Sequence, residues 1–118
     1  MALNYAAGDD LVFQMESGFG LVRVLGSEGE GAGAVWHVLV YQEFYPDVES
    51  AEAALAGGGA LAVREPHLAL TEHAFGKTPA ARLRNRPVED EELRALRRWR
   101  SEGGRAHDRS LLLMLGMR

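Results

Sequence analysis

The stretch GDDLVFQMESGFGLVRVLG, residues 8–26, decides the fold because it predicts two strands joined by a short turn. Leu11, Phe13 and Met15 alternate with less apolar neighbours, and a period of two is typical of a strand with one buried face. The glycines of ESGFG can take the backbone conformation of a tight connection. A second strand is then expected to run through Leu25, so the stretch predicts a β-hairpin.

The stretch AVWHVLVYQEF, residues 34–44, carries the strongest β pattern in the chain because it is rich in β-branched and aromatic residues. Apolar residues occupy both of its faces, which predicts a strand covered on both sides. His37 falls on one of these apolar faces. We expect it to be a hydrogen-bonded core residue, and a ligand or catalytic role is the alternative.

Two helices are predicted. A short helix near 47–56 can begin at a cap formed by Asp47 or Ser50. A longer helix near 88–101 has Pro87 at its start, acidic residues in its first turn and arginines toward its end, as the helix dipole favours. Its apolar residues Leu93, Leu96 and Trp99 form one stripe toward the core. Asp90 and Arg94 are four positions apart and can form an ion pair.

The remaining segments give weaker patterns. Residues 60–66 and 67–75 predict two short strands or extended pieces, which Pro66 separates at a sheet edge. Residues 76–87 contain two prolines and a glycine and predict a basic, extended or irregular segment. Residues 111–118 are expected to form either a buried last strand or an exposed dimer contact, and burial is the favoured interpretation.

These elements predict one α+β domain over residues 1–118. We expect a twisted antiparallel sheet of about five strands, rolled toward a small SH3-like barrel, with the two helices covering it. The chain contains no cysteine, which excludes disulfides, thiolate metal sites and a cysteine nucleophile. It shows no secretory signal and no apolar run long enough to cross a bilayer, so we expect a cytoplasmic protein without membrane contact.

Charge is unevenly distributed along the chain. Residues 1–76 carry two arginines and eleven acids, whereas residues 77–118 carry eleven basic residues and six acids. Such asymmetry can indicate a surface for nucleic acid or an acidic partner. The favoured interpretation is that the two halves face each other, within one chain or across a dimer.

The basic 77–109 region supplies the candidate binding residues, namely Arg82, Arg84, Arg86, Arg94, Arg97, Arg98 and Trp99. Such a group could meet the phosphates of a nucleic acid or an acidic ligand. Single-strand binders stack bases on several aromatic residues, and only Trp99 is aromatic within this region. The pI of about 5.5 also argues against a dedicated nucleic-acid protein.

No complete catalytic or metal motif is present, so we predict no catalytic residue, metal or cofactor. His67 and His73 would lie roughly 20 Å apart on one continuous strand, too far to share a metal. An enzyme with a small pocket near the central strand, around His37, Tyr41 or His67, is kept as an alternative.

The hairpin resembles a known family in three short motifs. These are Gly8–Asp9 before the first strand, the turn Gly18–Phe19–Gly20, and the second strand from Gly20 to Leu25. With these motifs, about a third of the chain resembles small bacterial SH3-like barrels of the immunity protein 26 kind. Proteins of that kind are partners of polymorphic toxins. The resemblance implies a partly closed antiparallel barrel that binds a protein and has no catalytic residues.

The sequence therefore predicts a non-enzymatic protein-interaction module, either immunity-like or homo-oligomeric. Its expected partner is another protein or a second copy of the chain. Binding of nucleic acid or an acidic ligand through residues 77–109 is the first alternative, and an enzyme is the second.

Overall fold

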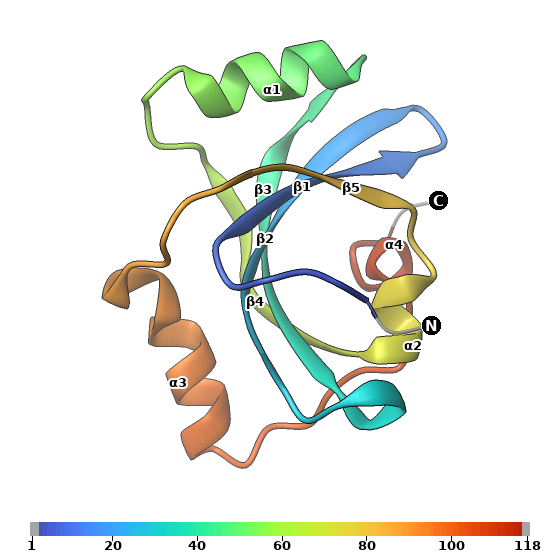
Figure 1. The fold of residues 1–118 in the computed structure, drawn as a ribbon, viewed down its shortest axis with the longest axis vertical. Helices are drawn as coiled ribbons and strands as arrows, with labels where there is room; N and C mark the ends of the chain where they lie inside the picture. The colour runs from blue at the N-terminus through green and yellow to red at the C-terminus, as the bar shows by residue number, and fades with distance from the viewer. Residues whose placement is uncertain (1–2, 117–118) are drawn as a thin grey trace.

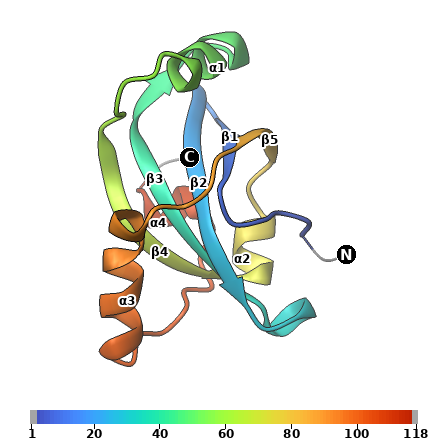
Figure 2. The same ribbon diagram turned by 60° about the vertical axis from the view of Figure 1, so that its left-hand side comes forward.

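The computed structural model describes residues 3–116, in which a curved five-stranded antiparallel sheet carries helices on both faces (Figures 1 and 2). The order of the strands is β4-β3-β2-β1-β5, so the last strand lies beside the first. The predicted α+β class and five-stranded sheet are confirmed, and the sheet stays open instead of closing into a barrel. The strands are β1 (Asp9–Met15), β2 (Gly18–Glu28), β3 (Val35–Tyr45), β4 (Val63–Thr71) and β5 (Ala80–Asn85).

Four short α-helices cover the sheet, with α1 and α3 on one face and α2 and α4 on the other (Figure 1). The two predicted helices are confirmed, although the second begins as the 3-10 turn η2. Asp47 caps the first of them, because its carboxylate accepts a hydrogen bond of 2.7 Å from the backbone N–H of Ser50. No helix within residues 3–116 is long and apolar enough to span a bilayer. The bounds are α1 (Val48–Ala56), α2 (Glu72–Gly76), η2 (Asp90–Leu93), α3 (Arg94–Ser101) and α4 (Leu111–Met114).

Two hydrophobic cores lie on the opposite faces of the sheet, as the alternation in the strands predicts. On β3, Trp36, Val38 and Val40 face the core under α2 and α4, whereas Leu39 and Tyr41 face the core under α1 and α3. The predicted two-sided burial of this strand is confirmed.

The β1–β2 hairpin is also confirmed, with Met15 paired to Gly18 across the turn. Gly20 lies opposite Phe13, and the Phe13 ring packs so closely on it that a Cβ at this position would overlap the ring. Close packing of an aromatic ring therefore requires a glycine here, and the Gly-aromatic-Gly motif has a structural cause.

The prediction of two strands over residues 60–66 and 67–75 is wrong. Residues 63–71 form the single edge strand β4, and Pro66 lies where its register with β3 shifts. A proline is tolerated in an edge strand at such a bulge because no ladder hydrogen bond needs its missing N–H. The chain then turns into α2, since the Thr71 hydroxyl accepts a hydrogen bond of 3.1 Å from Ala74 N–H.

Two other segments take a form that the sequence leaves open or predicts differently. Residues 80–85, predicted as part of an extended or irregular segment, form the strand β5 because they pair with β1. The last apolar segment forms α4 instead of a strand, and the Ser110 side chain caps it. Burial, the favoured interpretation, is confirmed for Leu111 and Leu115, while residues 117–118 lie outside the described residues.

Candidate functional site

The structure places the first two candidate arginines against buried carboxylates. Arg82 Nε donates a hydrogen bond of 2.8 Å to Asp9 Oδ2, and Arg84 Nε donates one of 2.8 Å to Asp10 Oδ2. Asp9 and Asp10 are 1% and 0% exposed. Both contacts join β5 to β1, and each supplies the charge that a buried carboxylate requires. These arginines therefore have a role in holding the sheet together.

Arg23 is a third member of this network, which we call the Arg23 network, and sequence reasoning did not single it out. It is 0% exposed, and its Nε lies 2.7 Å from Glu92 Oε2. Its other donors bond Gly8 O, Asp10 Oδ1, Arg86 O and Pro87 O. The sequence did contain a signal for this network, namely a single arginine among the apolar residues of a predicted strand. A buried guanidinium needs acceptors inside the protein, so such an arginine indicates buried partners.

Two carboxylates of the network, those of Asp9 and Glu92, stay charged at neutral pH. Burial raises the pKa of Asp9, but hydrogen bonds from Asn85, the backbone of Ala6 and Arg82 outweigh it and hold the pKa below its usual value. Burial also raises the pKa of Glu92, and hydrogen bonds from the Glu89 backbone and Arg23 bring it below its ordinary value. The carboxylates are thus ionised where they meet the guanidinium groups.

Further ion pairs join the acidic half of the chain to the basic half. Arg100 binds Glu28, and Arg23 binds Glu92, so contacts run in both directions between the halves. Within the basic half, Arg86 lies 3.7 Å from Glu92, and Arg97 lies 3.2 Å from Asp90, which was expected to pair with Arg94. The interpretation that the two halves face each other is confirmed within one chain.

Trp99, the aromatic candidate, packs against two histidines. The rings of His37 and His67 stack with centroids 5.1 Å apart, and Trp99 meets them edge-on at 5.0 and 5.4 Å. These contacts dock α3 on β3 and β4. The ring is therefore half-buried and held in place by contacts within the protein.

The two histidines also share a hydrogen bond. His37 Nδ1 lies 2.9 Å from His67 Nε2, so one of these nitrogens donates to the other. Glu28 Oε1 lies 3.7 Å from His37 Nε2, which favours a proton on Nε2 and makes His67 the donor. Burial lowers the pKa of His37, and burial together with His37 lowers the pKa of His67 to about 4. Both rings are neutral at pH 7.

The histidine pair fits the expectation of a hydrogen-bonded core residue at His37. The residues proposed for an enzyme pocket border different hollows, since Tyr41 lines one and His37 lines another. Among residues 3–116, no three side chains of the metal-binding kinds come together. The positions of His37 and His67 in the sequence did not indicate that they pair. They come together only because β3 and β4 are neighbours in the sheet.

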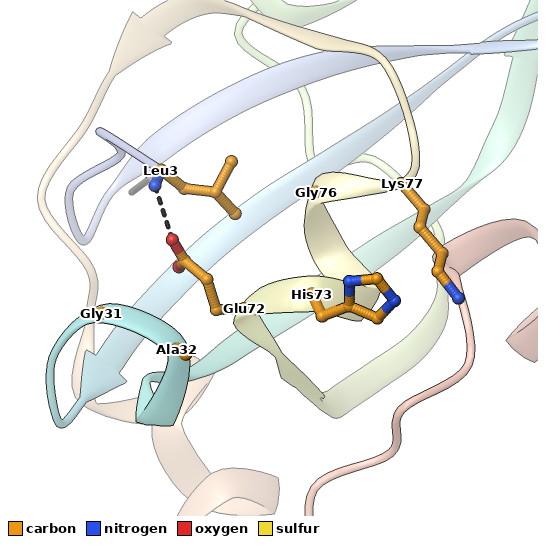
Figure 3. A pocket seen from close by; sticks show the side chains of 7 residues that line it. All are labelled: Leu3, Gly31, Ala32, Glu72, His73, Gly76 and Lys77. Carbon is orange, nitrogen blue, oxygen red and sulfur yellow. Dashed lines mark hydrogen bonds between the residues drawn. The ribbon is translucent and has the colours of Figure 1, made fainter. Parts of the chain in front are cut away.

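A hollow of about 590 Å³ lies beside α2 (Figure 3). Glu72 in this hollow accepts hydrogen bonds from the Leu3 N–H at 2.7 Å and from Trp36 Nε1 at 2.6 Å, so both carboxylate oxygens serve the fold. His73 and Lys77 point away from Glu72 (Figure 3), and both are exposed. The hollow therefore gathers no set of free polar groups.

A larger groove, of about 630 Å³, lies between α3 and the edge strand β4, and we call it the α3 groove. Its floor is largely apolar and its rim is charged. Of the six candidate arginines, only Arg94 and Arg98 form no ion pair among the residues that the structure describes, and both line this groove. The lining residues are Leu39, Ala60, Val63, Pro66, Ala95, Glu89, Glu91, Glu92, Arg94 and Arg98.

Comparisons with protein families, with curated proteins and with solved structures gave no match. The resemblance of the hairpin to immunity protein 26 barrels stays a prediction. Two of its glycine motifs have structural causes in this chain. Gly20 accommodates the Phe13 ring, and Gly8 has a φ of +93° with no room for a Cβ against the carbonyl of Arg86.

Proposed function

We propose that this protein is a non-enzymatic interaction module, and that the α3 groove binds a segment of a partner protein. The segment carries an apolar side chain flanked by carboxylates. One observation carries the proposal. Two arginines that form no ion pair within residues 3–116, Arg94 and Arg98, lie along a groove whose floor contains exposed apolar surface.

The floor of the groove supplies the apolar part of the interaction. Val63 is 42% exposed, which is unusual for a large apolar residue of a strand, and Leu39 lies beneath the groove. Ala60, Pro66 and Ala95 complete the apolar surface. Covering such surface with an apolar side chain contributes about 25 cal/mol per Å² removed from water.

Charges on the rim favour an acidic protein segment over a nucleic acid. Glu92 is already bound to Arg23, and Glu89 lies 4.0 Å from Arg86. Glu91 is then the one lining carboxylate without an ion pair among the described residues, and it stands against Arg94 and Arg98. A nucleic acid would bring a continuous row of phosphates against Glu89 and Glu91, which repel it. A protein segment can place its carboxylates only where the arginines lie.

The neighbouring edge of β4 is a poor template for strand addition. Pro66 lacks an N–H, and the register of β4 against β3 shifts twice between Val63 and Leu68. Natural proteins protect edge strands by such devices. Side chains entering the groove, and not an added strand, therefore make the contact that we propose.

A peptide-display selection against the folded protein tests this proposal. Enriched peptides are expected to carry an apolar residue next to Asp or Glu. Their binding should shift backbone amide resonances of residues 63–65 and 94–98 in a ¹⁵N spectrum. The double variant Arg94→Glu/Arg98→Glu should weaken binding by about tenfold or more, because two attractive charges become repulsive.

The matched control is Arg105→Glu/Arg109→Glu, which changes the same number of exposed arginines outside the groove and should leave peptide binding unchanged. Enriched peptides without the acidic and apolar pattern, or peptides that bind both double variants equally, would contradict the proposal. A single-stranded oligonucleotide that competes for the same residues would support the nucleic-acid alternative instead. Self-association in sedimentation that Arg94→Glu/Arg98→Glu abolishes would make a second copy the occupant.

A further inference from the structure

A second, smaller hollow lies on the other flank of α3, between this helix and the end of β2. Its volume is about 240 Å³, below the roughly 300 Å³ at which pockets for drug-sized ligands begin. We call it the His37 cleft. Leu25, Leu93 and Leu96 give it an apolar wall, and its polar side chains are Ser27, His37, Arg97 and Arg100.

One buried donor on this side lacks an acceptor. His37 is 1% exposed, and its Nε2 has no hydrogen-bond partner among residues 3–116. The Glu28 carboxylate comes nearest, but the separation of 3.7 Å between Oε1 and Nε2 is too long for a hydrogen bond. A buried polar group without a partner is costly, so this nitrogen stands out in the fold.

Arg97 and Arg100 line the same cleft as this donor, and neither is held by a buried acid. Arg97 pairs with Asp90, whose side chain is 91% exposed, and such surface pairs contribute little. Arg100 binds Glu28, whose side chain is 43% exposed. The hydrogen bond from Arg100 lowers the pKa of Glu28, so its carboxylate is charged.

The Glu28 carboxylate lies close to two of the donors of the cleft, Arg100 and His37 Nε2, and offsets the cost of bringing them together. Glu28 is the last residue of β2, and its carboxylate lies against Arg100 and near His37 Nε2. It is the anion that this chain itself supplies to the donors. Because its side chain is partly exposed and ends a strand, it can swing into solvent without disturbing either core.

We propose that His37 Nε2–H, Arg97 and Arg100 form a binding site for a small oxyanion, and that a free carboxylate or phosphate replaces the Glu28 carboxylate there. Bidentate pairing of guanidinium with an oxyanion supplies the affinity, and the imidazole N–H fixes the orientation. The size of the cleft limits the ligand to about the size of acetate, butyrate or inorganic phosphate. The leucine wall favours a carboxylate with a short apolar tail.

The experiment is a titration of ¹⁵N-labelled protein with acetate, butyrate and inorganic phosphate near neutral pH. Sodium chloride holds the ionic strength constant, and the readout is the histidine side-chain nitrogen resonances. His37 Nε2 is expected to shift saturably. If butyrate binds more tightly than acetate and phosphate, the ligand is a carboxylate. If phosphate binds most tightly, the ligand is a phosphate.

Glu28→Gln separates this site from a merely structural cluster. Removing the internal competitor should tighten binding about fivefold, because Arg100 and His37 become free for the ligand. Arg100→Gln should weaken binding about tenfold, and Arg97→Gln provides a second test if the first variant does not fold. Arg98→Gln, on the opposite flank of α3, is the matched control and should bind as the parent does.

A Glu28→Gln variant that binds no more tightly than the parent would overturn the proposal. So would the absence of a saturable shift at His37 Nε2 in both proteins, or equal affinities in Arg100→Gln and Arg98→Gln. The site shares no lining residue with the α3 groove, so either proposal can fail while the other stands.

Discussion

Arg23 and Glu92 are 69 positions apart in the chain, and the hydrogen bond between Arg23 Nε and Glu92 Oε2 is 2.7 Å long. This contact fastens the turn η2 to the centre of the sheet. Because η2 continues directly into α3, the same contact sets where the helix lies. Both the α3 groove and the His37 cleft therefore depend on an arginine that lines neither of them.

Arg23→Met should lower the free energy of unfolding by about 3–5 kcal/mol, because Glu92 and Asp10 lose a buried cationic partner. Urea denaturation followed by circular dichroism measures this difference. Arg109→Ala removes an exposed arginine and should stay within about 0.5 kcal/mol of the parent. A cost below about 1 kcal/mol for Arg23→Met would mean that the network adds no net stability.

Gly8→Ala should lower the free energy of unfolding by about 2 kcal/mol or more, because two effects add. Gly8 has a φ of +93°, and a Cβ there would overlap the carbonyl oxygen of Arg86. The comparison is with Gly59→Ala, where an added Cβ meets no atom within 4 Å. Equal denaturation midpoints for the two variants would refute this account of Gly8.

Stability should fall as the pH drops from about 6.5 toward 4, because the pKa of His67 is about 4 in the folded protein and about 6.5 in the unfolded chain. The unfolded chain binds more protons in this window, which favours unfolding. Burial lowers the pKa of His37 in the same direction, and the facing charges are Glu28 and Arg100.

The double variant His37→Leu/His67→Leu measures the contribution of the pair. Its unfolding free energy should stay nearly constant between about pH 6.5 and pH 5, above the range in which Asp9 and Glu92 take up protons. Denaturation curves across this range provide the comparison. A variant that loses as much stability as the parent would assign the pH dependence to other groups.

The triple variant Arg82→Ala/Arg84→Ala/Arg86→Ala should lose about 2–4 kcal/mol of stability, because Asp9 and Asp10 lose partners on β5. It should leave any affinity for an oligonucleotide, and its salt dependence, unchanged. Arg94→Ala/Arg98→Ala/Arg105→Ala removes the same charge and should cost about 1 kcal/mol or less. If the first triple variant were as stable as the parent and lost nucleic-acid binding, the basic segment would be a binding surface.

Much of the fold could be predicted from local pattern. The alternation in residues 11–15 and the two-sided apolar pattern of β3 gave the correct strands, and the charge gradient along residues 88–101 gave the correct helix. Where the sequence misled, long-range contacts prevailed. Residues 80–85 form a strand because β1 presents a free edge to them, and Pro66 is accommodated by a bulge that only the partner strand reveals.

The candidate sites could be predicted less well, for a physical reason. A run of arginines looks the same in sequence whether its charges face solvent or buried carboxylates, and the partners Asp9 and Asp10 lie more than 70 positions from Arg82 and Arg84. The pairing of His37 with His67 and the position of Glu28 likewise depend on how strands and a helix pack.

The strand order also bears on how the protein is made. Because β5 pairs with β1, a nascent chain on the ribosome cannot complete its sheet until residues 80–85 have emerged. Until residue 92 follows, Asp9, Asp10 and Arg23 lack partners that make their burial tolerable. The hairpin and β3 can form early, but cooperative folding must wait until residue 92 has emerged. During that interval the exposed edge of β1 is the part of the chain that most needs protection from other nascent proteins.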